Sequence, residues 1–95
     1  MDSEFNIQKY SFADMLNDLE IGHEIEFQYN KKQYAITNNM EGEWCFFADG
    51  KDTPLCQFEE RDILLNKVKS LSIQGKSLAC IIDQQLYDPD TLCIF

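Results

Sequence analysis

The fold is decided by residues 24–37, which read Glu24-Ile25-Glu26-Phe27-Gln28-Tyr29-Asn30-Lys31-Lys32-Gln33-Tyr34-Ala35-Ile36-Thr37. Polar and apolar side chains alternate through residues 24–29 and again through residues 33–37, with the period of two that is typical of a half-buried strand. The polar stretch between the two runs is typical of a turn. We therefore predict an antiparallel hairpin with one face buried and one face in water.

Two further strands are predicted after this hairpin. Residues 43–47 read Glu43-Trp44-Cys45-Phe46-Phe47 and are apolar on both faces, which favours a central or covered strand. Residues 55–58 form a shorter fourth strand. Polar, Gly- and Pro-containing stretches at residues 38–42 and 49–54 predict the turns between these strands.

Helical spacing of apolar residues appears before and after the strands. Ser11 and Asp14 approximate a capping box at the start of the first helix, and Gly22 ends that helix. A second helix follows residues 59–62, and a third begins near Ser77. Residues 88–90 break the third helix, and the last five residues form either a short strand or an apolar tail. Residues 1–10 form either a short strand or a docked arm.

This order of elements predicts the α+β fold class. An N-terminal helix precedes an antiparallel β-meander of about four strands, and two C-terminal helices follow. Strands grouped before helices favour an arrangement in which the helices cover one face of the sheet. A chain of 95 residues is short enough for a single domain, which we place at residues 1–95.

Composition and charge exclude several classes of protein. The net charge is −9, which argues against direct binding to nucleic acid or to an anionic membrane. Aromatic residues make up 13% of the chain, too many for a disordered protein. No apolar run reaches about 18 residues, and the acidic N-terminal residues do not resemble a signal peptide. The expected location is the cytoplasm.

The sequence shows no motif for catalysis, for a cofactor or for a metal ion. His23 is the one histidine, and no nucleophile signature surrounds any Ser or Cys. The cysteines Cys45, Cys56, Cys80 and Cys93 lack the close pairs that structural zinc sites use. Reduced thiols are expected inside a cell, although a hairpin disulfide between Cys45 and Cys56 stays open as an alternative. We therefore expect a protein without enzymatic activity.

The strongest electrostatic feature is an acidic segment at residues 14–26. It contains Asp14, Asp18, Glu20, Glu24 and Glu26 and no Lys or Arg. Residues 1–30 carry seven acidic residues and one basic residue, whereas residues 31–95 carry ten acidic residues and seven basic residues. Three interpretations stay open: a solvated face that maintains solubility, a surface for a basic partner protein, or mimicry of nucleic-acid phosphates.

The aromatic residues of the third strand suggest an apolar contact. A strand that is apolar on both faces cannot bury both of them if the helices cover only one face of the sheet. Trp44 or Phe47 is therefore a candidate anchor for a partner, with core packing as the alternative for each.

Scattered residues along most of the chain resemble a set of small acidic α+β proteins from low-GC Gram-positive bacteria and their mobile elements. They are Ser11-Phe12, Leu16, Leu19-Glu20, Gly22, Glu24-Ile25-Glu26-Phe27, Tyr29, Lys32, Tyr34, Ile36-Thr37-Asn38-Asn39, Trp44, Gly75-Lys76-Ser77-Leu78 and Ile94-Phe95. These pieces mark turns and helix starts rather than chemical motifs. The resemblance implies a mobile-element setting and transfers no catalytic activity to this chain.

Together these features favour a non-enzymatic module that binds a partner protein with a basic surface. In a mobile-element setting, one form of this function is inhibition of a basic or nucleic-acid-binding host or defence protein. A structural homodimer is the first alternative. The second is a small thiol- or metal-dependent module that uses Cys45, Cys56 and His23.

Overall fold

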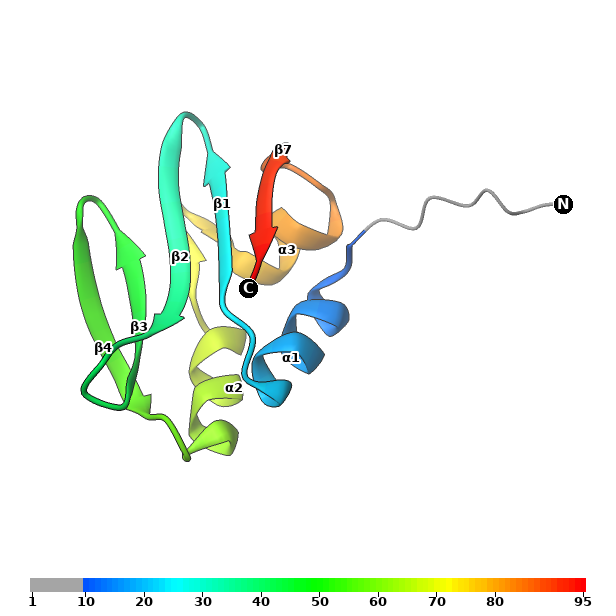
Figure 1. The fold of residues 1–95 in the computed structure, drawn as a ribbon. Coiled ribbons are helices and arrows are strands. Elements are labelled where there is room, and N and C mark those ends of the chain that lie inside the picture. Colours follow the sequence, from blue (N-terminus) through cyan, green and yellow to red (C-terminus); the bar gives the residue numbers. More distant parts are fainter. Residues whose placement is uncertain (1–9) are drawn as a thin grey trace, which may run out of the picture.

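The computed structural model describes residues 10–95 and shows a five-stranded antiparallel sheet with three helices (Figure 1). The strands lie in the order β4-β3-β2-β1-β7. The N-terminal strand or arm considered above falls almost entirely in residues 1–9, outside the described residues. The α+β class is confirmed, but the sheet has one strand more than the predicted meander.

Helix α1 spans Phe12–Ile21 and has the predicted ends. The Ser11 hydroxyl accepts a hydrogen bond from the Asp14 backbone N–H at 3.0 Å, and the Asp14 carboxylate accepts one from the Ser11 N–H at 3.0 Å. These two bonds complete the capping box and satisfy N–H groups that a helix start leaves without partners. Gly22 ends the helix at φ 109°, a left-handed conformation that favours glycine.

The first four strands follow one another as a meander. They are β1 (Ile25–Tyr29), β2 (Lys32–Asn38), β3 (Glu43–Ala48) and β4 (Lys51–Gln57). Asn30 and Lys31 both have positive φ, as do Asp49 and Gly50, so each pair forms the tight connection that suits a twisted hairpin. The predicted turn at residues 49–54 is therefore too long. Pro54 lies inside β4, which tolerates proline because it is an edge strand.

The fifth strand, β7 (Asp88–Ile94), is longer than the tail expected from sequence. It pairs antiparallel with β1, with Ile94 opposite Ile25 and Cys93 opposite Glu26. Between β4 and β7 the chain forms α2 (Arg61–Lys69), a minimal hairpin of β5 (Ser72–Ile73) and β6 (Lys76–Ser77), and α3 (Leu78–Asp83). The two later helices were predicted, whereas the minimal hairpin was not.

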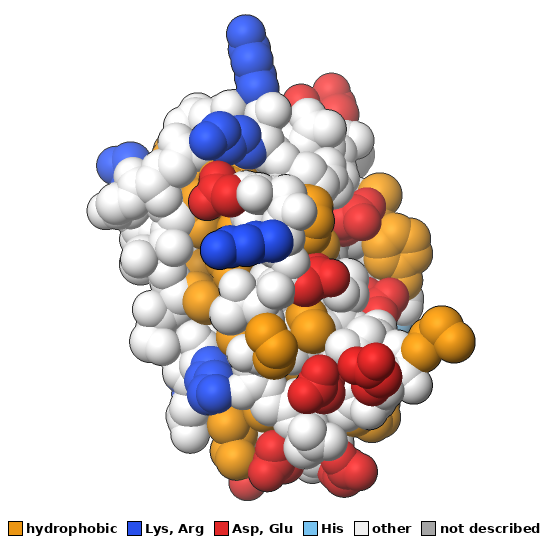
Figure 2. All heavy atoms as spheres, turned by 90° about the vertical axis from the view of Figure 1, so that its left-hand side faces the viewer, with side chains coloured by type: hydrophobic (Ala, Val, Ile, Leu, Met, Phe, Trp, Pro, Cys, Tyr) orange, Lys and Arg blue, Asp and Glu red, His pale blue; other side chains and the backbone are white. Residues whose placement is uncertain are grey.

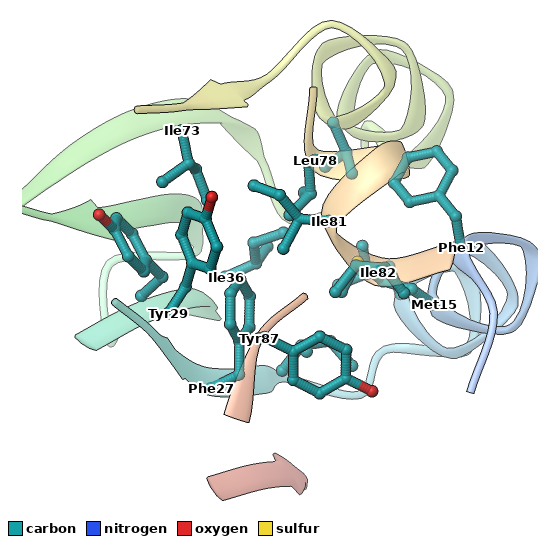
Figure 3. Close-up of a cluster of buried hydrophobic side chains, with 14 of the residues drawn as sticks. Phe12, Met15, Phe27, Tyr29, Ile36, Ile73, Leu78, Ile81, Ile82 and Tyr87 are labelled. Carbon is teal, nitrogen blue, oxygen red and sulfur yellow. The ribbon is translucent and has the colours of Figure 1, made fainter. Parts of the chain in front are cut away.

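The three helices lie on one side of the sheet (Figure 1). The main core fills the space between the helices and the sheet. Figure 3 shows Phe27 and Ile36 of the sheet directed toward Ile81 and Ile82 of α3. Phe27 also stacks on Tyr34, with 5.8 Å between the ring centroids. No helix in residues 10–95 is long and apolar enough to cross a membrane.

Candidate protein-binding surface

The side of the sheet opposite the helices is the candidate surface, and we call it the open face. Strand register places residues on it, because cross-strand partners share a face and successive residues alternate between faces. Ile25, Phe27 and Tyr29 are buried toward the helices, so Glu26 and Gln28 face the other way. By the same register the open face comprises Glu26, Gln28, Gln33, Ala35, Thr37, Glu43, Cys45, Phe47, Asp52, Pro54, Gln57, Asp88 and Cys93.

Five of these residues form one row across the whole sheet: Cys93, Glu26, Ala35, Phe47 and Asp52. Neighbouring members lie one strand spacing apart, about 4.8 Å. Phe47 is half-buried between the small side chain of Ala35 and the carboxylate of Asp52. The next row places Cys45 between Thr37 and Pro54. The centre of the open face is therefore apolar.

The charges around this apolar centre all have one sign. Glu26, Glu43 and Asp52 belong to the open face, and its register positions contain no Lys or Arg. The basic residues of the described chain lie at hairpin tips, at the start of β4, in α2 and in β6: Lys31, Lys32, Lys51, Arg61, Lys67, Lys69 and Lys76. Figure 2, seen from the β4 side, shows hydrophobic side chains between charged ones, with Lys and Arg mainly in the upper part. The open face thus combines apolar contact with negative charge.

A shallow depression of about 530 Å³ adjoins Phe47. Its lining also includes Gln33, Gly50 and the pair Lys32 and Asp49. The Lys32 Nζ lies 3.6 Å from the Asp49 carboxylate, and both side chains are well exposed, so the pair contributes little to stability. The depression gives a partner side chain a place to contact the Phe47 ring.

The structure separates the five residues of the predicted acidic segment. Asp14 caps α1, and Asp18 accepts a hydrogen bond of 2.5 Å from the Tyr10 hydroxyl. Glu24 accepts one of 2.8 Å from the Asn38 backbone N–H. Glu20 is exposed on α1, in the helical layer. Glu26 lies on the open face and Glu24 stands two residues before it, whereas Asp14, Asp18 and Glu20 belong to α1, so the segment is not one continuous surface.

Trp44 is wrong as a candidate anchor, because its side chain is 0% exposed. Its indole N–H donates to the Phe58 carbonyl oxygen at 3.2 Å, and its ring stacks on Phe58 with centroids 5.6 Å apart. The Arg61 guanidinium lies 5.9 Å from the Trp44 ring centroid. Phe47, three residues later, lies on the open face and stays a candidate.

Cys45 and Cys56 lie on neighbouring strands, β3 and β4, whereas His23 lies in the connection between α1 and β1. A register shift places Cys56 opposite Trp44 and Pro54 opposite Cys45, so the two thiols face opposite sides of the sheet and the hairpin disulfide is wrong. Burial, with the nearby Asp52 and Glu43 carboxylates, raises the pKa of the Cys45 thiol. The His23 Nδ1 lies 3.1 Å from the Phe95 backbone oxygen. The described residues contain no metal-binding cluster of three or more His, Cys, Asp or Glu.

Sequence reasoning missed several members of the open face. Glu43 begins the third strand, but its side of the sheet depends on a register that only tertiary pairing supplies. Asp52 and Pro54 fell inside a predicted turn. The Asp49-Gly50 pair, which suits a two-residue hairpin turn, was the available signal for a longer β4.

No known protein family, no curated protein sequence and no solved structure matches this chain. Any function must therefore be inferred from the surface itself.

Proposed function

We propose that this protein is a non-enzymatic interaction module whose open face binds the basic surface of a partner protein. The observation that carries the proposal is the composition of that face: three carboxylates surround a half-buried phenylalanine, with no Lys or Arg at its register positions. Acidic groups at the rim attract and orient a basic partner, and a central aromatic ring supplies apolar contact.

Two alternatives receive less support. Self-association through the open face would bring Glu26, Glu43 and Asp52 of two copies against one another, and like charges across an interface are unfavourable. A thiol-dependent activity would need an ionised cysteine, but the pKa of both Cys45 and Cys56 is raised. We propose the cytoplasm as its location, where thiols stay reduced.

The mobile-element setting implied by the sequence resemblance suggests one form of this function. A partner that normally binds nucleic acid has a basic surface. An acidic module that covers this surface would inhibit the partner, while its net charge of −9 keeps it from binding nucleic acid itself.

The test is affinity capture from a lysate of the organism that encodes the protein, followed by binding measurements with the captured partner. The variant combines Glu26→Lys and Asp52→Lys on the open face. The control is Glu20→Lys, an exposed acidic residue in the helical layer. We expect the double variant to lose both the affinity and its decrease with added salt, while the control retains them. Equal binding by wild type and double variant would contradict the proposal.

A further inference from the structure

The sheet has two edge strands, β4 and β7, and they differ in how their backbone groups are used. Three features close the second half of the β4 edge, at residues 54–57. Pro54 has no N–H to offer, the Leu55 carbonyl accepts a hydrogen bond from the Lys67 ammonium group, and the Gln57 N–H donates to the Glu60 carboxylate at 2.9 Å. Native sheets use such features to prevent the addition of another strand.

The first half of β7 is closed in a similar way. Pro89 again lacks an N–H, and the Asp88 carboxylate accepts a hydrogen bond from the Asp90 N–H at 3.1 Å. The Thr91 hydroxyl donates to the Asp88 carbonyl at 2.6 Å and accepts from the Gln28 N–H at 2.8 Å.

The second half of β7 has no such protection among the described residues. The Phe95 N–H donates to the Glu24 carbonyl at 2.8 Å, which fixes the alternation along the strand. Residues 93 and 95 therefore direct their backbone groups to β1, and Leu92 and Ile94 direct theirs outward. No side chain in residues 10–95 bonds to these outward groups. This half of β7 is an open template for strand pairing.

The side chains near this open template are apolar and exposed. Ile94 is 42% exposed and Phe95 is 61% exposed. Ile21 is 70% exposed and lies two residues before His23, whose ring contacts the Phe95 backbone oxygen. A strand added beside β7 could therefore bury apolar surface as well as form backbone hydrogen bonds.

The charges here determine what kind of strand fits. Neither β1 nor β7 contains Lys or Arg, whereas Glu26, Asp88 and Asp90 are all acidic. A second copy of the chain would bring two molecules of net charge −9 together, which is unfavourable. We infer that the second half of β7 accepts an extended, basic segment of the partner protein as a sixth strand. This inference rests on the proposed function and specifies how the partner is held.

The added strand would also connect to the open face. Cys93 pairs with Glu26 in the row that continues to Phe47. A residue of the added strand opposite Cys93 would lie two strand spacings from Glu26, about 10 Å, and a lysine there could extend toward that carboxylate. Backbone hydrogen bonds supply affinity in this mode of recognition, and the alternating side chains supply specificity.

The test uses the full chain labelled with ¹⁵N and a capped seven-residue peptide of alternating lysine and valine. The control peptide replaces each lysine with glutamate. We expect the basic peptide to shift amide resonances of residues 24–26 and 92–95 and to slow hydrogen exchange at Leu92 and Ile94, and the acidic peptide to do neither. Equal responses to the two peptides, or no response to either, would overturn the inference.

Two variants at one position separate the backbone from the side chain. Ile94→Pro removes an outward N–H, as Pro54 does in β4, and we expect it to weaken peptide binding about tenfold, or about 1.4 kcal/mol. Ile94→Val retains the N–H and should bind like the wild type. The exchange measurements on the wild-type chain decide the question even if the proline variant fails to fold.

The remaining outcomes distinguish this inference from the proposed function. Shifts centred on Phe47 with β7 unchanged would overturn the edge inference and leave open-face binding intact. Concentration-dependent shifts at β7 without peptide would overturn it in favour of self-pairing. Binding that appears only after residues 1–9 are removed would overturn it by assigning the edge to this chain's own N-terminal segment.

Discussion

The guanidinium group of Arg61 lies 4.3 Å from the centroid of the Phe58 ring, and its Nε donates to the carbonyl oxygen of the same residue at 2.9 Å. A second nitrogen of the guanidinium donates to the Glu20 carbonyl in the last turn of α1. The Arg61 side chain therefore connects the start of α2 to the end of α1 and to the stacked rings of Trp44 and Phe58.

We expect Arg61→Ala to lower the free energy of unfolding by about 1–3 kcal/mol, because it removes a cation–π contact and leaves a helix carbonyl without its partner. Urea unfolding followed by circular dichroism measures the change. Lys76→Ala, at an exposed position in β6, is the control and should change stability by less than about 0.5 kcal/mol. A similar loss in both variants would contradict the structural role of Arg61.

Trp44 and Phe47 should separate stability from binding. We expect Trp44→Ala to lower the free energy of unfolding by about 3–5 kcal/mol, because it empties a fully buried site. Phe47→Ala should cost about 1 kcal/mol in stability, since the ring is half-buried, and about 2 kcal/mol in affinity for the partner. Thermal unfolding and calorimetric titration measure the two quantities. A stable Trp44→Ala variant with weakened binding would reverse these assignments.

Asp14 should act on folding rather than on partner binding. Asp14→Ala removes one half of the capping box, and we expect a loss of about 0.5–2 kcal/mol in unfolding free energy. Its affinity for the partner should match that of the wild type, because α1 lies on the side of the sheet opposite the open face. Reduced affinity in a folded Asp14→Ala variant would return α1 to the candidate surface.

Alkaline pH should destabilise the protein. Burial raises the pKa of Cys45, Cys56, Tyr10 and Tyr87 in the folded chain, and the Asp18 hydrogen bond raises that of Tyr10 further. Unfolded thiols ionise near pH 8.5, so above about pH 8.5 the unfolded state binds fewer protons and is increasingly favoured. The stability that these protonated groups add to the folded state is therefore fully present below about pH 8.5 and is lost as the pH rises.

Urea midpoints measured at intervals from about pH 7 to pH 10 should decrease steadily. Cys45→Ala removes one of the titrating groups and should make the decrease smaller. Ellman's reagent at about pH 8 provides a second measurement, in which exposed Cys93 reacts before buried Cys45. A pH-independent midpoint, or earlier modification of Cys45, would contradict the prediction.

Elements with local causes can be predicted from the amino-acid sequence alone. The Ser11–Asp14 capping box and Gly22 set the ends of α1, because both act within one or two helical turns. Strict alternation set the β1–β2 hairpin and its buried side, because the side-chain period of a strand is two. Ser77 set the start of α3 for the same local reason, since its hydroxyl accepts a hydrogen bond from the Cys80 N–H.

Features that depend on pairing between distant segments become visible only in the folded chain. β7 joins the sheet beside β1 although residues 30–87 separate the two strands, so no local pattern marks residues 88–94 as an edge strand. Trp44 is buried because Phe58 and the helices pack against it. Asp52 lies on the open face because of its cross-strand register with Phe47. Register and packing are interactions between segments, and neither can be derived from one segment alone.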